Sequence, residues 1–145
     1  MKQTGELDNA CGIIASLHSI FNNFDKGVSV TEGSVLDEFI KGSQGKTPAE
    51  IATLLEGFDK FKQAHVAAAG QGQSSAAAPV RHHYVCFTLD PNGNLVEYDG
   101  MKAGPYVIEE KCENFLKGCS KELQRRMAEG VCSESLSCMT LSASQ

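Results

Sequence analysis

The chain has 145 residues, a length that suits one domain with a core of ordinary proportions. Its 41% hydrophobic and 21% charged residues are typical of a soluble globular protein. The formal net charge of -5 argues against nucleic acid as a partner and favours a basic one. No apolar run approaches the roughly 18 residues that a membrane-spanning helix needs, so a membrane partner is not expected either.

The cysteine pattern argues against a zinc site and against a disulfide framework. The six cysteines stand at 11, 86, 112, 119, 132 and 138, without a Cys-x-x-Cys pair and without a histidine at metal-ligand spacing. An even number would suit disulfides, but no secretory signal precedes them, and Cys86 and Cys138 lie in apolar, strand-like runs. We therefore expect reduced thiols in a cytoplasmic or nuclear protein.

An amphipathic helix is predicted from Ala10 onward. Its apolar residues recur at spacings of three and four: Ile13, Ile14, Leu17, Ile20, Phe21 and Phe24. With Asp8 or Asn9 as the N-cap, Cys11 falls in the first turn, where free backbone N–H groups and the helix dipole favour a thiolate. A cysteine taken at random is more often a packing residue than a nucleophile, so the position alone leaves both interpretations open.

Further helices and a low-complexity segment follow. Residues 22–27 predict a helix end at Gly27, and a short helix is expected near residues 35–41. Thr47 as N-cap, Pro48 at the first helical position and Glu50 completing a capping box begin another helix, predicted to continue into the sixties. From 67 to 79 the chain is almost entirely Ala, Gly, Gln and Ser, which is typical of a flexible linker.

A β-hairpin is predicted at residues 83–98, with its turn at Asp90-Pro91-Asn92-Gly93. A turn centred near residues 91 and 92 pairs positions whose numbers add to about 182–184, and cross-strand Cβ atoms are about 5 Å apart. Asp99 then lies directly or nearly opposite His83, within hydrogen-bonding reach. The alternative for His83 is an ordinary hydrogen-bonded strand residue.

Beyond the hairpin we expect a short strand at 104–108, a long surface helix at 109–128 and a closing strand at 136–141.

Several segments together resemble the ubiquitin C-terminal hydrolases, a family of papain-like cysteine peptidases. The resemblance starts at Lys2-Gln3-Thr4 and Asn9-Ala10-Cys11-Gly12, and continues in the family's order through Thr47-Pro48-Ala49-Glu50, residues 65–75, His83-Tyr84-Val85 and residues 95–100. It covers nearly the whole chain. It implies one catalytic domain with an α+β, papain-like fold, in which a helical lobe carries Cys11 and an antiparallel sheet carries His83 and Asp99.

The resemblance also implies the chemistry, which is hydrolysis of an ester, thioester or amide after the C-terminal glycine of ubiquitin or a close ubiquitin-like protein, with no metal or cofactor. The expected catalytic residues are Cys11 as nucleophile, His83 as base, Asp99 as the group that orients the imidazole and Gln3 as oxyanion donor. The expected substrate-binding residues are Asn9, Gly72, Gln73 and Ser74. The segment at about 67–79 would be a crossover loop over the cleft that admits only small or unfolded leaving groups.

Three departures from the family pattern bear on these expectations. Two extra residues between Gln3 and Cys11 require the intervening segment to loop outward, and the hairpin turn is one residue longer than usual. Family members also carry several tens of residues ahead of the glutamine, so we expect an N-terminally truncated domain. Two alternatives therefore stay open: a catalytically weak or inactive ubiquitin-binding module, and a different Cys-His acyl transferase on the same fold.

Overall fold

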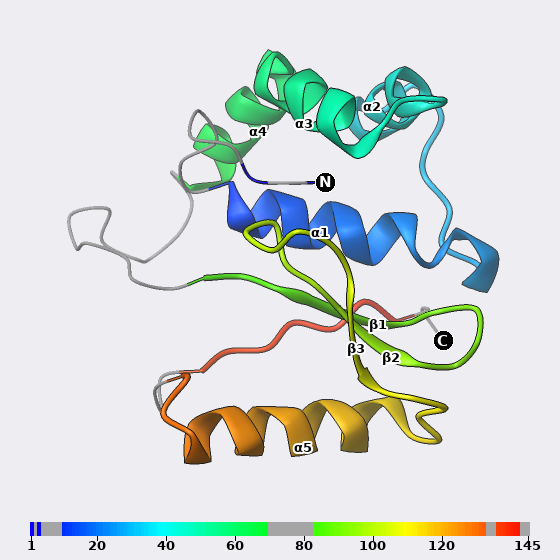
Figure 1. Ribbon diagram of the computed structural model, residues 1–145. Helices are drawn as coiled ribbons and strands as arrows, with labels where there is room; N and C mark the ends of the chain where they lie inside the picture. Colours follow the sequence, from blue (N-terminus) through cyan, green and yellow to red (C-terminus); the bar gives the residue numbers. More distant parts are fainter. Residues whose placement is uncertain (2, 4–9, 70–82, 133–135, 143–145) are drawn as a thin grey trace.

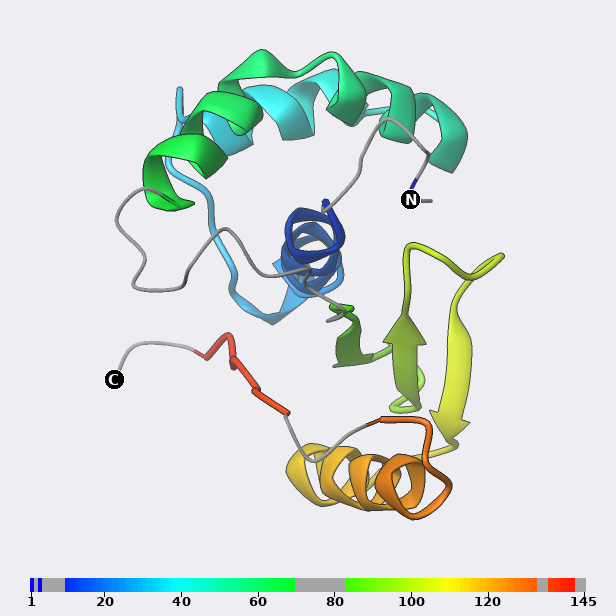
Figure 2. The same ribbon diagram turned by 90° about the vertical axis from the view of Figure 1, so that its left-hand side faces the viewer.

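The computed structural model describes residues 1, 3, 10–69, 83–132 and 136–142, and combines a group of helices with a small antiparallel sheet (Figure 1). The elements are α1 (Cys11–Phe21), the 3-10 helix η1 (Phe24–Lys26), α2 (Val35–Ser43), α3 (Pro48–Glu56), α4 (Asp59–Ala69), β1 (Cys86–Leu89), β2 (Leu95–Tyr98), β3 (Tyr106–Glu109) and α5 (Phe115–Ala128). Helix α1 lies between the sheet and the layer formed by α2, α3 and α4, and α5 lies on the far side of the sheet (Figures 1 and 2). The expected α+β architecture is confirmed.

The helical layer is held together by a cluster of apolar side chains around Phe39. Phe39 is fully buried, and its ring lies 5.5 Å from that of Phe58 and 5.2 Å from that of Phe61. Ile14 and Leu17 of α1 are 1% and 2% exposed and belong to the same cluster, which confirms the predicted stripe of α1. Burial of aromatic and aliphatic side chains on this scale is the main term that stabilises the lobe.

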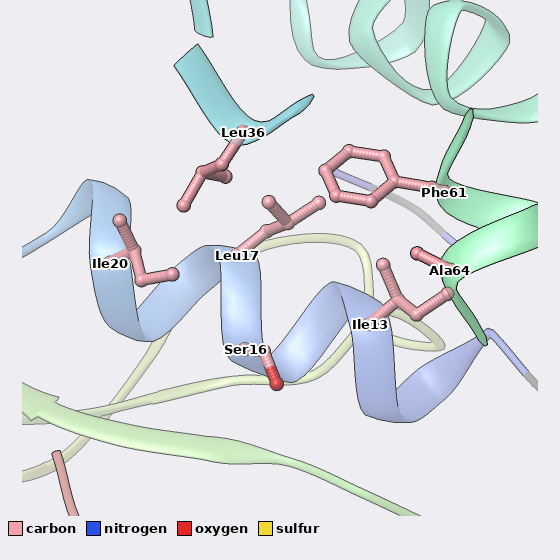
Figure 3. Close-up of a pocket in the computed structure, with 7 residues that line it drawn as sticks. All are labelled: Ile13, Ser16, Leu17, Ile20, Leu36, Phe61 and Ala64. Carbon is pink, nitrogen blue, oxygen red and sulfur yellow. The ribbon is translucent and has the colours of Figure 1, made fainter. Parts of the chain in front are cut away.

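An apolar groove lies between α1, α2 and α4 (Figure 3). Leu17 of α1, Leu36 of α2 and Phe61 of α4 are among its lining residues. It lies on the side of α1 that faces the helical layer, away from the sheet, so it is separate from the hairpin that carries His83 and Asp99. Within the described ranges, no helix is long and apolar enough to span a bilayer.

The sheet has the strand order β1-β2-β3, with both pairs antiparallel. The β1–β2 register pairs Cys86 with Tyr98 and Leu89 with Leu95. At the turn, the Asp90 carboxylate accepts the backbone N–H groups of Asn92 (2.9 Å) and Asn94 (2.8 Å), and Gly93 adopts a φ of 81° that favours glycine. The predicted hairpin and its turn are confirmed, although the ladder begins only at Cys86.

The predicted N-terminal cap is confirmed for α3 and is wrong for α1. Thr47 Oγ1 accepts the N–H of Glu50 (3.3 Å) and Glu50 Oε2 accepts the N–H of Thr47 (2.7 Å), so the predicted capping box is confirmed. The predicted cap of α1 at Asp8 or Asn9 is wrong. Ala10 occupies the N-cap position, its carbonyl accepts the N–H of Ile14, and its methyl side chain cannot cap the helix.

The predicted helix into the sixties is divided into α3 and α4 at Gly57. Glycine is unfavourable in a helix interior, and Asp59 suits the first turn of a new helix. The break turns the chain so that Phe58 and Phe61 both reach Phe39. Helix α1 also ends earlier than the apolar pattern predicts, at Phe21. Phe24 belongs instead to η1, which ends at Gly27 with a φ of 89°.

Two predictions for the C-terminal part are wrong. Glu109 ends β3 rather than starting a helix, because Leu95 pairs with it and the N–H of Cys112 then donates to Gly93 O (2.8 Å). Helix α5 starts at Phe115, after Asn114, whose side chain caps it by accepting the N–H of Lys117 (3.0 Å). Residues 136–142 form no strand, since they make no ladder with the three described strands.

Candidate active site

Cys11 is the first residue of α1, as its proposed role requires. Its thiol is free and partly exposed. A Cβ atom built on the next residue, Gly12, would lie 3.7 Å from Cδ2 of the Tyr84 ring, so the backbone of α1 approaches that ring closely. Gly12 follows Cys11, and Tyr84 follows His83. The contact therefore brings the start of α1 beside the segment 83–85, called the histidine segment below.

The far end of α1 is held against the same strand. The side-chain amide of Asn23 donates to Thr88 Oγ1 (3.2 Å), and Lys26 Nζ donates to Leu89 O (2.6 Å). His18, in the middle of the helix, stacks on Tyr98 of β2 with ring centroids 4.9 Å apart. Helix α1 is therefore fixed to the hairpin along its length. Burial, followed by the nearby N-terminal charge, lowers the pKa of His18, which is a neutral packing residue here.

His83 and Asp99 form a direct pair, as the hairpin register predicts. His83 Nε2 lies 2.6 Å from Asp99 Oδ1, and the Asp99 side chain is 9% exposed. Burial raises the pKa of Asp99, but hydrogen bonds from the N–H of Met101 and from His83, with the nearby positive charges, outweigh it, so that this pKa lies below its usual range. The charged carboxylate thus accepts the Nε2 proton and leaves Nδ1 of the imidazole as the basic nitrogen.

This pair is a diagonal one. Continuing the register beyond Cys86 and Tyr98 would place Asp99 opposite Val85, and His83 lies two residues before Val85, ahead of β1. Diagonal neighbours are about 7–8 Å apart at the backbone, which imidazole and carboxylate side chains span. The geometric prediction of a His83–Asp99 hydrogen bond is confirmed, and the catalytic roles of the two residues stay predictions.

Gln3 is brought to the same place by the turn that follows Asp99. Its backbone N–H donates to Gly100 O at 2.7 Å. A Cβ atom on Gly100 would lie 3.2 Å from Ile14 Cγ2 and 3.3 Å from Gln3 Cβ, so any larger residue here would push α1 or Gln3 away from the turn by a few tenths of an ångström. Gln3, the start of α1 and the Asp99 turn therefore meet, while the oxyanion role of the Gln3 side chain stays a prediction.

The other predicted site residues are not placed. Asn9, Gly72, Gln73 and Ser74 lie outside the described residues. The predicted crossover segment begins inside a helix, because residues 67–69 form the last turn of α4, and residues 70–79 are again outside the described part. Alanine is the strongest helix former, which explains why this alanine-rich stretch extends α4.

Two other thiols are poor competitors for the role of nucleophile. Burial, assisted by a neighbouring thiol, raises the pKa of Cys86 to about 11. Burial likewise raises the pKa of Cys119 to about 11. Since the thiolate is the reactive form, both are inert near neutral pH. No group of three or more His, Cys, Asp or Glu side chains among the described residues is arranged to hold a metal ion.

The sequence did not reveal a network of charged side chains behind the Asp99 turn. Glu97 of β2, one of the most buried residues of the protein, binds Lys102 through one carboxylate oxygen and Arg126 of α5 through the other. The sequence does show an acidic residue, Glu97, within the predicted strand 94–98. A carboxylate buried in a sheet is expected only when a cation pairs with it. Nothing in the sequence indicates which cation does so.

A cysteine at the start of a helix that is packed beside the segment leading into a strand, with a histidine of that segment paired with a carboxylate, is the arrangement of a papain-like cysteine peptidase. Comparison with known families identifies the class more closely. The family model described as "Ubiquitin carboxyl-terminal hydrolase, family 1" matches residues 1–128. The chain belongs to this family, and its fold is papain-like.

Several curated relatives support the assignment. The chain is 39% identical to "Ubiquitin carboxyl-terminal hydrolase 3" of Arabidopsis thaliana over 72% of its own length and 43% of the relative's. It is 34% identical to "Ubiquitin carboxyl-terminal hydrolase" of Drosophila melanogaster, covering 94% of this chain and 60% of the relative. With the human "Ubiquitin carboxyl-terminal hydrolase isozyme L1" it shares 34% identity over 89% and 58% of the two lengths. The chain thus spans about half the length of the curated relatives it matches.

Proposed function

We propose that this protein is a deubiquitinating thiol hydrolase, which cleaves ester, thioester or amide bonds after the C-terminal glycine of ubiquitin or a close ubiquitin-like protein. The observation that carries the proposal is the 2.6 Å pair of His83 and Asp99 beside the start of α1. A module that only binds has no need of an imidazole oriented by a buried carboxylate. The names of the relatives, all ubiquitin carboxyl-terminal hydrolases, supply the substrate.

In the proposed reaction the sulfur of Cys11 attacks the carbonyl carbon of the terminal glycine, and its proton passes to Nδ1 of His83. Asp99 stabilises the imidazolium through Nε2. The Gln3 side-chain amide and the backbone N–H of Cys11 donate to the oxyanion. The leaving group departs with the proton from His83, and the acyl-enzyme is then hydrolysed by a water molecule that His83 activates.

The direct test is turnover of ubiquitin that carries a small fluorophore as a C-terminal ester. Release of the fluorophore is expected, with a KM well below that for the same fluorophore on a short glycine-ended peptide, because the folded part of ubiquitin supplies binding energy. Binding of ubiquitin without any release would contradict the enzyme and support the binding module. Equal turnover of the peptide ester would point to an acyl transferase or esterase without preference for ubiquitin.

We further propose that residues 67–79 restrict the leaving group to small or unfolded chains. The support is the family resemblance, together with the place of residues 70–79 in the sequence, after α4 and before the segment that carries His83 into β1. Ubiquitin joined to a peptide should be cleaved and ubiquitin joined to a folded protein should not. Inserting roughly ten Gly and Ser residues within 70–79 should raise the ratio of folded to unfolded turnover, since flexible insertions cost little closure entropy.

The matched control is the same insertion at the exposed residues 31–33, which should leave that ratio unchanged. An unchanged ratio after insertion within 70–79 would show that selectivity arises elsewhere.

We also propose that the chain acts as a single catalytic domain in the cytoplasm or nucleus. All six cysteines are free thiols in the structure, and the proposed nucleophile must stay reduced to act.

A further inference from the structure

An ion pair between the buried carboxylate of Glu97 and the half-exposed Lys102 closes the turn that carries Asp99. The Glu97 side chain has no exposed surface, and Lys102 Nζ binds its Oε2 atom from the other end of the turn. The other oxygen, Oε1, accepts Arg126 Nη1 at 2.8 Å. Glu97 lies two residues before Asp99 and Lys102 three residues after it, so the Glu97–Lys102 pair spans the segment that presents the carboxylate to His83.

We propose that Lys102 is a positioning residue of the candidate active site: its ion pair with Glu97 holds the turn 99–102 in the conformation that aims Asp99 at His83. This inference rests on the proposed hydrolase function. It assigns Lys102 no contact with substrate, and its effect passes entirely through Asp99.

The geometry of the turn explains why its conformation matters. The N–H of Lys102 donates to Asp99 O at 3.1 Å, and the N–H of Met101 donates to Asp99 Oδ1 at 2.8 Å. That same Oδ1 atom accepts from His83 Nε2. The direction of the carboxylate is therefore fixed by the backbone N–H of Met101, and the turn itself is closed by that of Lys102. Any opening of the turn moves the oxygen that orients the imidazole.

The same turn supports the rest of the site. Gly100 binds the backbone N–H of Gln3 and approaches Ile14 of α1 so closely that a Cβ atom would lie 3.2 Å away. A shift of the turn would therefore change the placement of Gln3 and of the start of α1 together with that of Asp99. A misplacement of about 1 Å in a reacting group costs on the order of a hundredfold in rate.

The pair is rigid because both of its members have further partners. Arg126 is bound by Glu122 (2.7 Å) and lies over the Phe87 ring, with its guanidinium carbon 5.4 Å from the ring centroid. The Lys102 ammonium lies 5.6 Å from the centroid of the Tyr106 ring. Glu97 is thus anchored from α5, and Lys102 is held between Glu97 and β3. An exposed ion pair contributes little, whereas a buried carboxylate is costly to leave without its partner.

The test compares Lys102→Met, which keeps the aliphatic stem and removes the charge, with Lys102→Arg, which keeps the charge. The control is Lys121→Met, because Lys121 forms an exposed pair with Glu109 at 3.6 Å, away from the turn. For Lys102→Met we expect kcat on the ubiquitin ester to fall about tenfold to a hundredfold. KM should change less than about twofold, since ground-state binding is untouched. Lys102→Arg should recover most of the rate, and Lys121→Met should match the unmodified protein.

The ring nitrogens of His83, observed by NMR in the protein without substrate, report on the same pair independently of turnover. Lys102→Met should shift the Nε2 resonance toward that of an imidazole without a fixed carboxylate partner. Unchanged kcat and unchanged His83 resonances in folded Lys102→Met would overturn the proposal. If Lys102→Met fails to fold, Glu97→Gln, which keeps the shape and one acceptor, should give the same NMR shift, and its absence would overturn the proposal equally.

The two proposals fail in different ways. If the unmodified protein has no hydrolase activity, the proposed function is wrong, but the His83 resonances still decide whether Lys102 positions Asp99. If the protein is active and Lys102→Met is as active, only the positioning role is wrong.

Discussion

Replacing Cys11 with alanine is expected to reduce turnover of the ubiquitin ester by about 10⁵- to 10⁶-fold, the loss that follows removal of a catalytic nucleophile. The same change should abolish covalent labelling by a ubiquitin that carries a C-terminal electrophile. The thiol stands at the first residue of α1, where the backbone of the next residue approaches Tyr84, and Cys11 is the one cysteine among the proposed site residues. Affinity for ubiquitin should persist, because its folded surface makes most of the contacts.

The matched control is Cys138→Ala. Cys138 is an exposed thiol, so it is available to electrophiles in general, but it lies in the C-terminal segment 136–142, away from α1. This variant should label with the electrophilic ubiquitin as the unmodified protein does. Equal labelling of Cys11→Ala and the unmodified protein would contradict the assignment, and mass spectrometry of the labelled peptide would then identify the thiol that reacts.

Local signals in the sequence predicted the parts of the fold that depend on neighbouring residues. The capping box of Thr47 and Glu50 and the turn at Asp90 are made by side chains that reach the backbone within four residues. The hairpin register is also a local feature, because it follows from the turn, and it places His83 near Asp99. These features depend on contacts between residues that are close in the sequence, and the structure agrees with them.

Predictions failed where distant contacts decide the outcome. Helix α3 ends at Glu56, and two phenylalanines of the next segment, Phe58 and Phe61, then pack on Phe39, about twenty positions earlier in the chain. Glu109 is recruited into β3 by Leu95 across the sheet, against its helical propensity. The segment 136–142 is largely apolar, but a strand exists only with a partner strand, and none of the three described strands pairs with it. Periodicity within a segment carries no information about any of these partners.

The same distinction applies to the candidate site. Cys11, His83 and Asp99 follow from a helix start and a hairpin, so their placement was predictable. The pairing of Glu97 with Arg126 joins residues 29 positions apart and exists only because α5 packs against the sheet. Sequence reasoning identified the groups proposed to react, but not the groups that hold them in place.

Replacing Asp99 with asparagine is expected to lower kcat by about 10³- to 10⁴-fold while KM and the affinity for ubiquitin change little. The asparagine side chain fits the same space and can still accept from Met101. If its NH₂ group faces Nε2 of His83, however, the imidazole must carry its proton on Nδ1. That tautomer cannot accept the proton of the Cys11 thiol, so the loss falls on the chemical step. His83→Ala should be at least as damaging.

Two controls separate this tautomer effect from general damage. Asp25→Asn makes the same chemical change at an exposed position in η1 and should leave kcat unchanged. His82→Ala removes the histidine next to His83 in the sequence and should also leave it unchanged. Full activity in His83→Ala, with loss of activity in His82→Ala, would show that the strand carries the other histidine into the site. Full activity in Asp99→Asn would show that the 2.6 Å contact stabilises the hairpin without orienting the base.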